Sequence, residues 1–173
     1  EQLVERYGCK AAAIQCWNQL QSETGIMPCA ANALMNEEGI PVVCETDIHG
    51  AITALLVEAA GMGEKRSFFA DWTIRHPDIA NGELLQHCGP WPISVAKETP
   101  KLTYPLAFDY PGSITAEAKH GEVTLARFDG DNGEYSLLLG NARGVEGPRG
   151  MGTYLWVEVE NIRRLEAKIV EGP

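Results

Sequence analysis

Apolar and polar positions in the first half of the chain alternate between helical and extended patterns. Residues 28–38 have a helical composition, with Pro28 suited to a first turn and Gly39 to the stop. The β-branched run IPVVC (40–44) is typical of a buried parallel strand, and GAITALLVEAAG (50–61) predicts a deeply buried helix. Other patterns predict a helix at 1–8 that ends at Gly8, and strands at 10–17 (KAAAIQCW), 67–72 (SFFADW) and 83–88 (ELLQHC).

This order, with helices between successive strands, indicates an α/β layer with a mostly parallel sheet. The character changes near residue 98, where a Pro-rich stretch (91–112) is incompatible with a helix. Short strand patterns separated by turn signals then follow at 113–119, 122–128, 134–145 and 152–160, before a closing helix at 161–170 with Asn161 as its N-cap. These patterns predict a small antiparallel, barrel-like β domain.

We therefore expect two units. Residues 1–98 would form the C-terminal part of an α/β domain, and residues 99–173 a β-rich C-terminal domain that is truncated before its end. The chain begins with Glu1 rather than Met and stops at Pro173 directly after a helix pattern. We expect it to be an excised portion of a longer protein.

Composition excludes several functions. The formal net charge of -10 argues against nucleic acid and anionic membrane partners, which need clustered Lys and Arg. No apolar run approaches the roughly 18 residues of a membrane span. The five cysteines form no C-x-x-C pair and lie in apolar surroundings, so we expect a reduced, cytoplasmic protein rather than a disulfide scaffold or zinc ribbon.

Polar side chains follow the carboxyl ends of four predicted strands. Ligands of parallel α/β sheets bind beyond these ends. The side chains are Glu23, Glu45 with Asp47, Asp71 with Trp72, and His87. Carboxylates and an imidazole at one sheet edge suit a divalent cation such as Mg²⁺ or Mn²⁺. Each residue also has a structural interpretation: Glu23 as a solvated charge, Asp47 as an N-cap, Trp72 and His87 as core residues.

The acidic segment DGDNGE (129–134) resembles the start of a calcium loop. It lacks the spacing and terminal Glu of an EF-hand and has no flanking helices. The dipeptide Asn132-Gly133 instead predicts a hairpin turn.

The run NEEGIPVVCETDIHGAITALLVEAA (36–60), followed by FFADW and then LLQHCGP, resembles the L-fucose and L-arabinose isomerase superfamily, in particular its fucose-isomerase-like branch. The similarity extends over most of the chain and is strongest from about residue 15 to 100. It implies that this chain is the C-terminal portion of a subunit with two α/β domains and a β-rich domain. It also implies a symmetric homo-oligomer with sites near the subunit contacts.

The resemblance further implies a metal, usually Mn²⁺, held by two carboxylates and a histidine. In the fucose branch the carboxylates are 24 residues apart and the second lies in the segment matching ETDIHG, so Asp47 pairs with Glu23 (47 − 24 = 23). Glu45 is then only a neighbour of the site. The arabinose branch has a ligand glutamate where this chain has Ala70, and its ligand histidine matches His87, which would lie near the sugar or the metal.

The implied reaction is a metal-dependent aldose–ketose interconversion through a cis-enediol, with Glu23 and Asp47 as metal ligands and acid–base pair, and Trp72 against the sugar ring. A further ligand histidine of the family is expected beyond the helix and Gly-Pro at 172–173, and its absence predicts weak metal binding and an inactive fragment. The main alternative is a non-catalytic sugar-binding or oligomerisation fragment of the same fold. A metal-dependent hydrolase is a second alternative.

Overall fold

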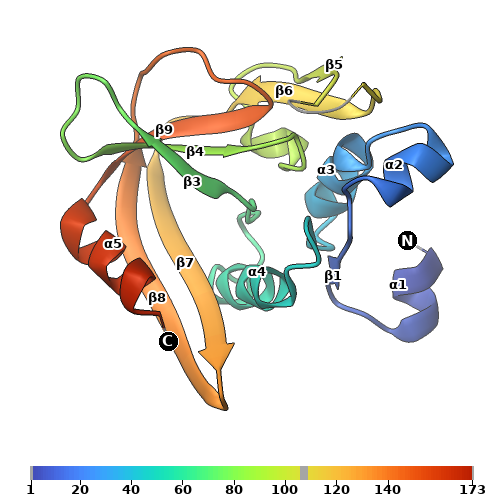
Figure 1. The fold of residues 1–173 in the computed structure, drawn as a ribbon, viewed down its shortest axis with the longest axis horizontal. Helices are drawn as coiled ribbons and strands as arrows, with labels where there is room; N and C mark the ends of the chain where they lie inside the picture. Colours follow the sequence, from blue (N-terminus) through green and yellow to red (C-terminus); the bar gives the residue numbers. More distant parts are fainter. Residues whose placement is uncertain (1, 106–108, 173) are drawn as a thin grey trace.

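The computed structural model describes residues 2–105 and 109–172, so residues 106–108 of the Pro-rich stretch (91–112) fall outside the described part. A helical part with a small sheet lies beside a part built on a large sheet (Figure 1). The helical part contains α1 (Gln2–Tyr7), β1 (Ala12–Ala13), α2 (Gln19–Thr24), α3 (Cys29–Glu37), β2 (Val42–Val43) and α4 (Ile48–Ala60). Strands β1 and β2 are parallel, with Ala12 opposite Val42 and Ala13 opposite Val43. The predicted parallel α/β layer is therefore confirmed for this one strand pair.

The first and third helices end at the glycines that the sequence predicts. Gly8 (φ 63°) follows α1, and Gly39 (φ 83°) follows the C-cap of α3. The amide after each glycine closes the helix end, from Cys9 N to Val4 O at 2.9 Å and from Ile40 N to Met35 O at 3.0 Å. A left-handed residue at this position satisfies backbone carbonyls that the helix leaves free, which explains the glycine.

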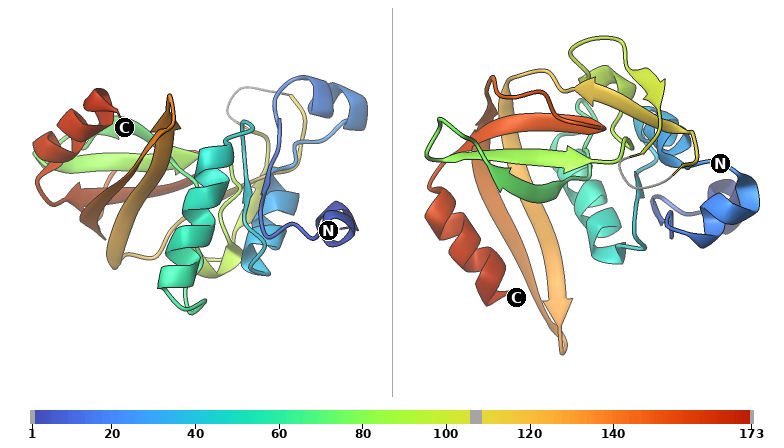
Figure 2. Two further views of the ribbon diagram at one scale, coloured as in Figure 1. Left: turned by 90° about the horizontal axis from the view of Figure 1, so that it is seen from below. Right: turned by 45° about the horizontal axis from the view of Figure 1, so that its top comes forward.

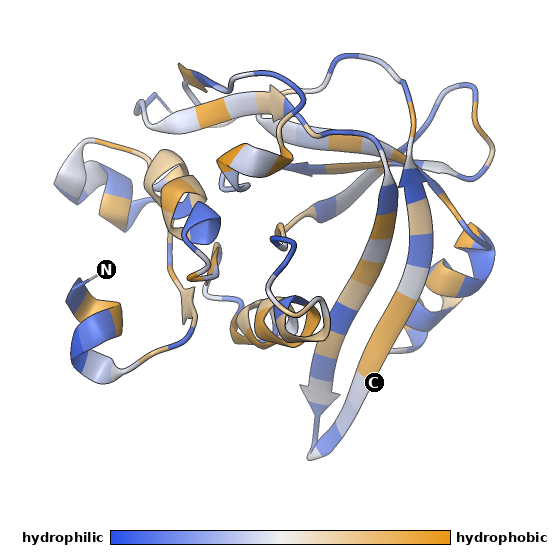
Figure 3. Ribbon diagram, turned by 180° about the vertical axis from the view of Figure 1, so that it is seen from behind, coloured by the Kyte–Doolittle hydropathy of each residue, from blue (hydrophilic) through white to orange (hydrophobic). Residues whose placement is uncertain are grey.

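Helix α4 is not deeply buried, so that expectation was wrong. It lies between the β1–β2 pair and β7 (Glu122–Asp131), and these neighbours leave part of its surface uncovered (Figure 1). The uncovered surface exposes Ile48 by 63% and Leu56 by 44%, and apolar colour covers most of the helix in Figure 3. The buried residues of the helix are Gly50, Ala51, Thr53 and Ala54.

The large sheet has seven strands and is mostly antiparallel. Its main path runs β3-β4-β9-β6-β5, and β8 pairs with both β9 and β7. Besides β7 it contains β3 (Asp71–Arg75), β4 (Gly82–His87), β5 (Lys101–Thr103), β6 (Ser113–Glu117), β8 (Glu134–Gly144) and β9 (Thr153–Val159). A short 3₁₀ helix (Ile93–Val95) precedes β5. The sheet is open and does not close on itself, so the barrel-like expectation was wrong (Figure 2).

The two strands predicted at 67–72 and 83–88 were expected to lie parallel in the α/β layer, and this was wrong. The first strand begins only at Asp71, so it shares just its first two residues with the predicted range, and it forms the antiparallel hairpin β3–β4, in which β4 also pairs with β9 of the large sheet. Only residues 76–81 connect them, and a parallel crossover needs a dozen or more residues. The short connection permits a hairpin alone. The domain boundary at 98/99 stays a prediction.

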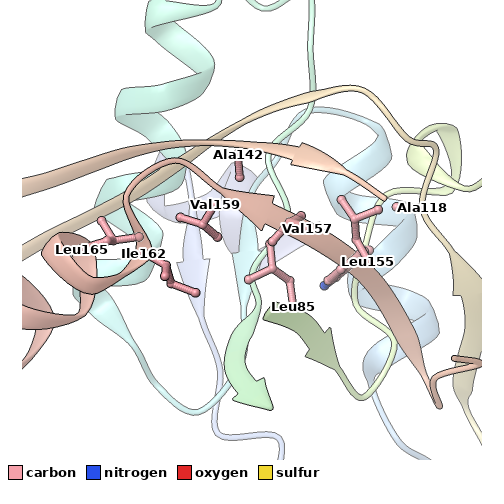
Figure 4. Close-up of a cluster of buried hydrophobic side chains, with 9 residues drawn as sticks. Leu85, Ala118, Ala142, Leu155, Val157, Val159, Ile162 and Leu165 are labelled. Carbon is pink, nitrogen blue, oxygen red and sulfur yellow. The ribbon is translucent and has the colours of Figure 1, made fainter. Parts of the chain in front are cut away.

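The main hydrophobic core lies around the central strand β9, which is buried over nearly its whole length. Helix α5 (Ile162–Glu171) packs on it through Ile162 and Leu165 (Figure 4). Asn161 lies at the N-cap of α5, but its φ of 55° and the lack of a side-chain cap bond show that it does not cap through its side chain.

The β7–β8 connection confirms the predicted hairpin turn. Asp131 pairs with Glu134, and the two residues between them, Asn132 (φ 50°) and Gly133 (φ 85°), are both left-handed. Two positive φ angles in a two-residue loop define the type I′ turn that Asn-Gly favours. In the described ranges, no helix combines the length and apolar character that a membrane crossing requires.

Candidate metal centre

Three separate segments bring Glu45, Asp71 and His87 together. Glu45 follows β2 by two residues, Asp71 is the first residue of β3, and His87 is the last residue of β4. The antiparallel register sets Asp71 opposite Gln86, the neighbour of His87. One ligand atom from each of the three side chains lies within 4.8 Å of the other two, and His87 Nε2 is 3.9 Å from Glu45 Oε1.

The His87 imidazole is the most unusual group in this cluster. The residue is only 2% exposed, and neither ring nitrogen has a hydrogen-bond partner among the described residues. Its ring lies against Phe69, with ring centroids 5.2 Å apart. Burial lowers the pKa of His87, and the nearby Glu45 carboxylate opposes this only in part. The imidazole is therefore neutral at neutral pH, with a lone pair available to a metal.

Both carboxylates belong to exposed residues, and the neighbouring atoms still desolvate Asp71 enough to raise the pKa of its carboxyl group. The backbone at Glu45 (φ 62°) and Thr46 (φ 59°) is left-handed at two consecutive non-glycine residues. That conformation is a genuine outlier for β-branched threonine and is found mainly at functional sites. The bond from Thr46 N–H to Ile14 O (3.1 Å) holds this turn against the end of β1.

The donor types of the cluster fit a divalent cation. One imidazole nitrogen and two carboxylate oxygens within mutual reach suit Mn²⁺ and similar ions. A buried polar atom without a partner costs about 1–3 kcal/mol, so the two unpartnered nitrogens of His87 favour a bound ligand at this position.

The predicted pair Glu23 and Asp47 does not belong to this three-residue cluster. Glu23 lies on α2, a helix that the sequence pattern did not predict, where it is exposed and accepts a hydrogen bond from Gln19 Nε2 (2.8 Å). Asp47 is the N-cap of α4: its Oδ1 accepts from Gly50 N at 2.9 Å, which confirms the capping interpretation. The roles of both residues as metal ligands stay predictions.

The second oxygen of Asp47 forms an ion pair with Arg127 of β7. Next to it, His49 Nδ1 lies 2.8 Å from Asp129 Oδ1, and Phe128 N–H donates to Thr53 Oγ1 at 2.9 Å. These contacts hold the N-terminal half of α4 against β7. Asp47 thus has structural partners on both oxygens.

Trp72 follows Asp71 and points to the other face of β3, because successive strand residues alternate. It packs against the main core, and its indole N–H donates to Glu166 of α5 at 3.3 Å. Trp72 thus has the core position that was the structural interpretation of this residue. Its contact with a sugar stays a prediction.

A second group with metal-ligand side chains contains Glu117, His120 and Glu146. Lys97 Nζ lies 3.5 Å from Glu117 and 3.2 Å from Glu146, and His120 Nε2 lies 2.8 Å from Glu117. Lys97 thus already offsets one of its two carboxylate charges. Only the first cluster combines convergent donors with unsatisfied buried atoms among the residues described.

The sequence did contain a signal for the cluster. Glu45, Asp71 and His87 were all among the polar residues next to predicted strands, and the fucose-type spacing then favoured Glu23 with Asp47 instead. Position next to a predicted strand, and not the 24-residue spacing, therefore pointed to the three residues of this cluster. Asp71 stands at the start of its strand rather than at the end, which only the hairpin pairing reveals.

Comparison with known proteins finds similarity to sulfoquinovose isomerases, and no family model matches the chain. The chain is 30% identical over 145 residues to the enzymes of Priestia aryabhattai and Priestia megaterium (strain ATCC 12872 / QMB1551), and 29% identical over 142 residues to that of Alkalicoccus urumqiensis. Each match covers 80% of this chain and 31% of the relative, so the chain spans about a third of the length of these curated relatives.

Proposed function

We propose that this chain serves a sugar aldose–ketose isomerase, and that Glu45, Asp71 and His87 hold its divalent cation, Mn²⁺. The observation that carries the proposal is the buried, unpartnered His87 imidazole within reach of two carboxylates. The similarity to sulfoquinovose isomerases supports the reaction class. The narrower fucose-type assignment has no support from the relatives' names.

A bound divalent cation would polarise two adjacent sugar oxygens and stabilise the negative charge that develops on them. The chain's own residues supply the rest. Neutral His87 presents a lone pair and no charge, so the two carboxylates alone offset the charge of the ion.

Proton transfer between neighbouring sugar carbons needs a base that can also return the proton. In the proposed reaction, a carboxylate removes the proton from the carbon beside the carbonyl and returns it to the former carbonyl carbon, while the neighbouring hydroxyl proton passes to the carbonyl oxygen, with the cis-enediol as the intermediate. Asp71 and Glu45 are the two carboxylates of the cluster, and either can hold this proton between its removal and its return.

We take an aldose as the substrate. The relatives are named for sulfoquinovose, and sulfoquinovose therefore leads the panel of sugars to be tested, followed by fucose and arabinose. A symmetric homo-oligomer and a cytoplasmic setting are further parts of the proposal. All five cysteines have free thiols, which is consistent with a reducing compartment.

The test uses the protein in the length that its gene encodes, with ketose formation and bound Mn²⁺ measured together. Glu45→Gln, Asp71→Asn and His87→Gln are each expected to abolish ketose formation and to lower metal content. Glu23→Gln serves as the matched surface control, since Glu23 contacts only Gln19. Loss of activity in Glu23→Gln with normal activity in Glu45→Gln would overturn this ligand set in favour of the Glu23–Asp47 pair.

One substitution separates the roles of Asp47. Asparagine is also a good N-cap, so Asp47→Asn retains the helix cap and removes the charge together with the ion pair to Arg127. If Asp47 is part of the acid–base machinery, Asp47→Asn loses activity although the protein still folds. Wild-type activity after verified metal removal by EDTA would refute the metal-dependent scheme. Stable metal binding without ketose formation from any sugar would favour the non-catalytic alternative.

A further inference from the structure

The segment that follows His87 is one of the most deeply buried parts of the protein. Pro90, Trp91 and Pro92 are all less than 2% exposed, and Trp91 belongs to the main core cluster. Two side-chain hydrogen bonds join this segment to the chain segments that carry the other two residues of the metal centre.

The first of these bonds comes from Asn36 on α3. Its Nδ2 donates to Pro90 O at 2.7 Å and to Val42 O at 3.2 Å, and its Oδ1 accepts from Val42 N at 2.6 Å. Val42 lies three residues before Glu45, and Pro90 lies three residues after His87. One buried amide therefore fixes the distance between the two segments that present Glu45 and His87.

The second bond comes from Trp91. Its indole N–H donates to Phe69 O at 2.6 Å, and Phe69 lies two residues before Asp71. The Phe69 ring also packs against the His87 ring. This bond fixes the lead-in to β3, and with it Asp71, relative to His87.

We propose that Asn36 and Trp91 are positioning residues of the metal centre, which act through the 88–92 segment to hold Glu45 and Asp71 at the spacing that His87 requires. This inference rests on the proposed function. Metal–ligand distances tolerate only about ±0.2 Å, and Glu45, Asp71 and His87 come from three separate segments, so their relative positions need support. Together the two bonds link all three segments to one rigid, Pro-flanked core.

Two substitutions remove the bonds selectively. Asn36→Asp retains the acceptor for Val42 N–H and loses the donor to Pro90 O and Val42 O. Trp91→Phe retains an aromatic ring and loses the indole N–H. Each is expected to weaken Mn²⁺ binding about 10-fold or more, as outer-shell changes at metal sites commonly do. Each is also expected to change the visible spectrum of bound Co²⁺, which reports ligand geometry. Asn36→Ser replaces Asn36→Asp if the buried acid prevents folding.

The chain provides matched controls. Trp156 Nε1 donates to Pro148 O at the same 2.6 Å, in a separate hydrophobic cluster, so Trp156→Phe removes an equivalent bond away from the metal centre. Asn141→Asp is the control for the amide change, because Asn141 bonds only to surface Glu160 and has no part in the 88–92 segment. Both controls are expected to bind Mn²⁺ and Co²⁺ like the wild type.

The outcomes separate this inference from the proposed function. Wild type that binds Mn²⁺ no better than Glu45→Gln overturns the metal centre, and the inference with it. The positioning roles alone are overturned if wild type binds Mn²⁺ and if Asn36→Asp and Trp91→Phe match Trp156→Phe in Mn²⁺ affinity and Co²⁺ spectrum. The imidazole NMR signals of His87 provide a metal-free check: they should shift in Asn36→Asp and Trp91→Phe but not in Trp156→Phe.

Discussion

Replacement of His87 by leucine should stabilise the metal-free protein. The imidazole is 2% exposed and has no hydrogen-bond partner on either nitrogen within the described residues. At about 1 kcal/mol for each unsatisfied nitrogen, the lower end of the usual range, leucine relieves about 2 kcal/mol. Loss of the ring contact with Phe69 offsets about 1 kcal/mol of this. The net gain of about 1 kcal/mol corresponds to a Tm higher by about 2–4 °C.

Metal should reverse this order. Mn²⁺ at about 100 times its Kd stabilises wild type by about 2.7 kcal/mol through mass action, and His87→Leu should gain little or nothing. Thermal unfolding of both proteins, measured after EDTA treatment and then with Mn²⁺, tests the reasoning. A metal-free His87→Leu that is less stable than wild type would show that the imidazole has partners. An equal gain from Mn²⁺ in both proteins would remove His87 from the metal centre.

Three further predictions concern other parts of the fold. Asp47→Ala and Asp47→Asn both lose the ion pair to Arg127, but only Asp47→Ala also loses the cap on α4, so its unfolding free energy should be lower by about 1 kcal/mol than that of Asp47→Asn; urea unfolding distinguishes them. Gly133→Ala places a β-carbon at φ 85° in the hairpin turn and should lower stability by about 1 kcal/mol in the same assay, unlike Gly121→Ala, where space is open and φ is not positive. Burial raises the pKa of Glu83 in the folded state, against the opposing effect of Arg75, so protonation favours folding. We therefore compare the unfolding free energy of wild type with that of Glu83→Gln as a function of pH. The difference, wild type minus variant, should rise as pH falls from this raised pKa toward the ordinary value of 4.5. A difference that falls over this range would contradict the raised pKa of Glu83.

Several elements could be predicted from the sequence because their causes are local. The helix ends at Gly8 and Gly39, the turn at Asn132-Gly133 and the cap at Asp47 each depend on the conformational preferences of a few adjacent residues. The alternating strands of the second half were also found, since side-chain alternation identifies a strand without reference to its partner.

The expectations that were wrong concern mainly how strands pair and how helices pack. The strand at 83–88 was recognised and the one at 67–72 was placed about four residues too early, because β3 spans Asp71–Arg75. The patterns of these strands say nothing of whether they pair parallel or antiparallel, and the short connection at 76–81 was not taken into account. The apolar helix at 50–61 was expected to be deeply buried because it is apolar on all sides, yet its neighbours leave part of its surface uncovered. The helix α2 that carries Glu23 was missed, because its residues show no apolar periodicity.

The candidate metal centre likewise has features that the sequence predicts and features that depend on the tertiary structure. The sequence by itself determined that Glu45, Asp71 and His87 stand beside strands, where functional residues are common. Only the tertiary structure decided that these three converge within 4.8 Å, that Asp47 is engaged by Gly50 and Arg127, and that His87 is buried without a partner. The physical reason is that burial and convergence depend on strand pairing and packing between distant segments, which no local pattern encodes.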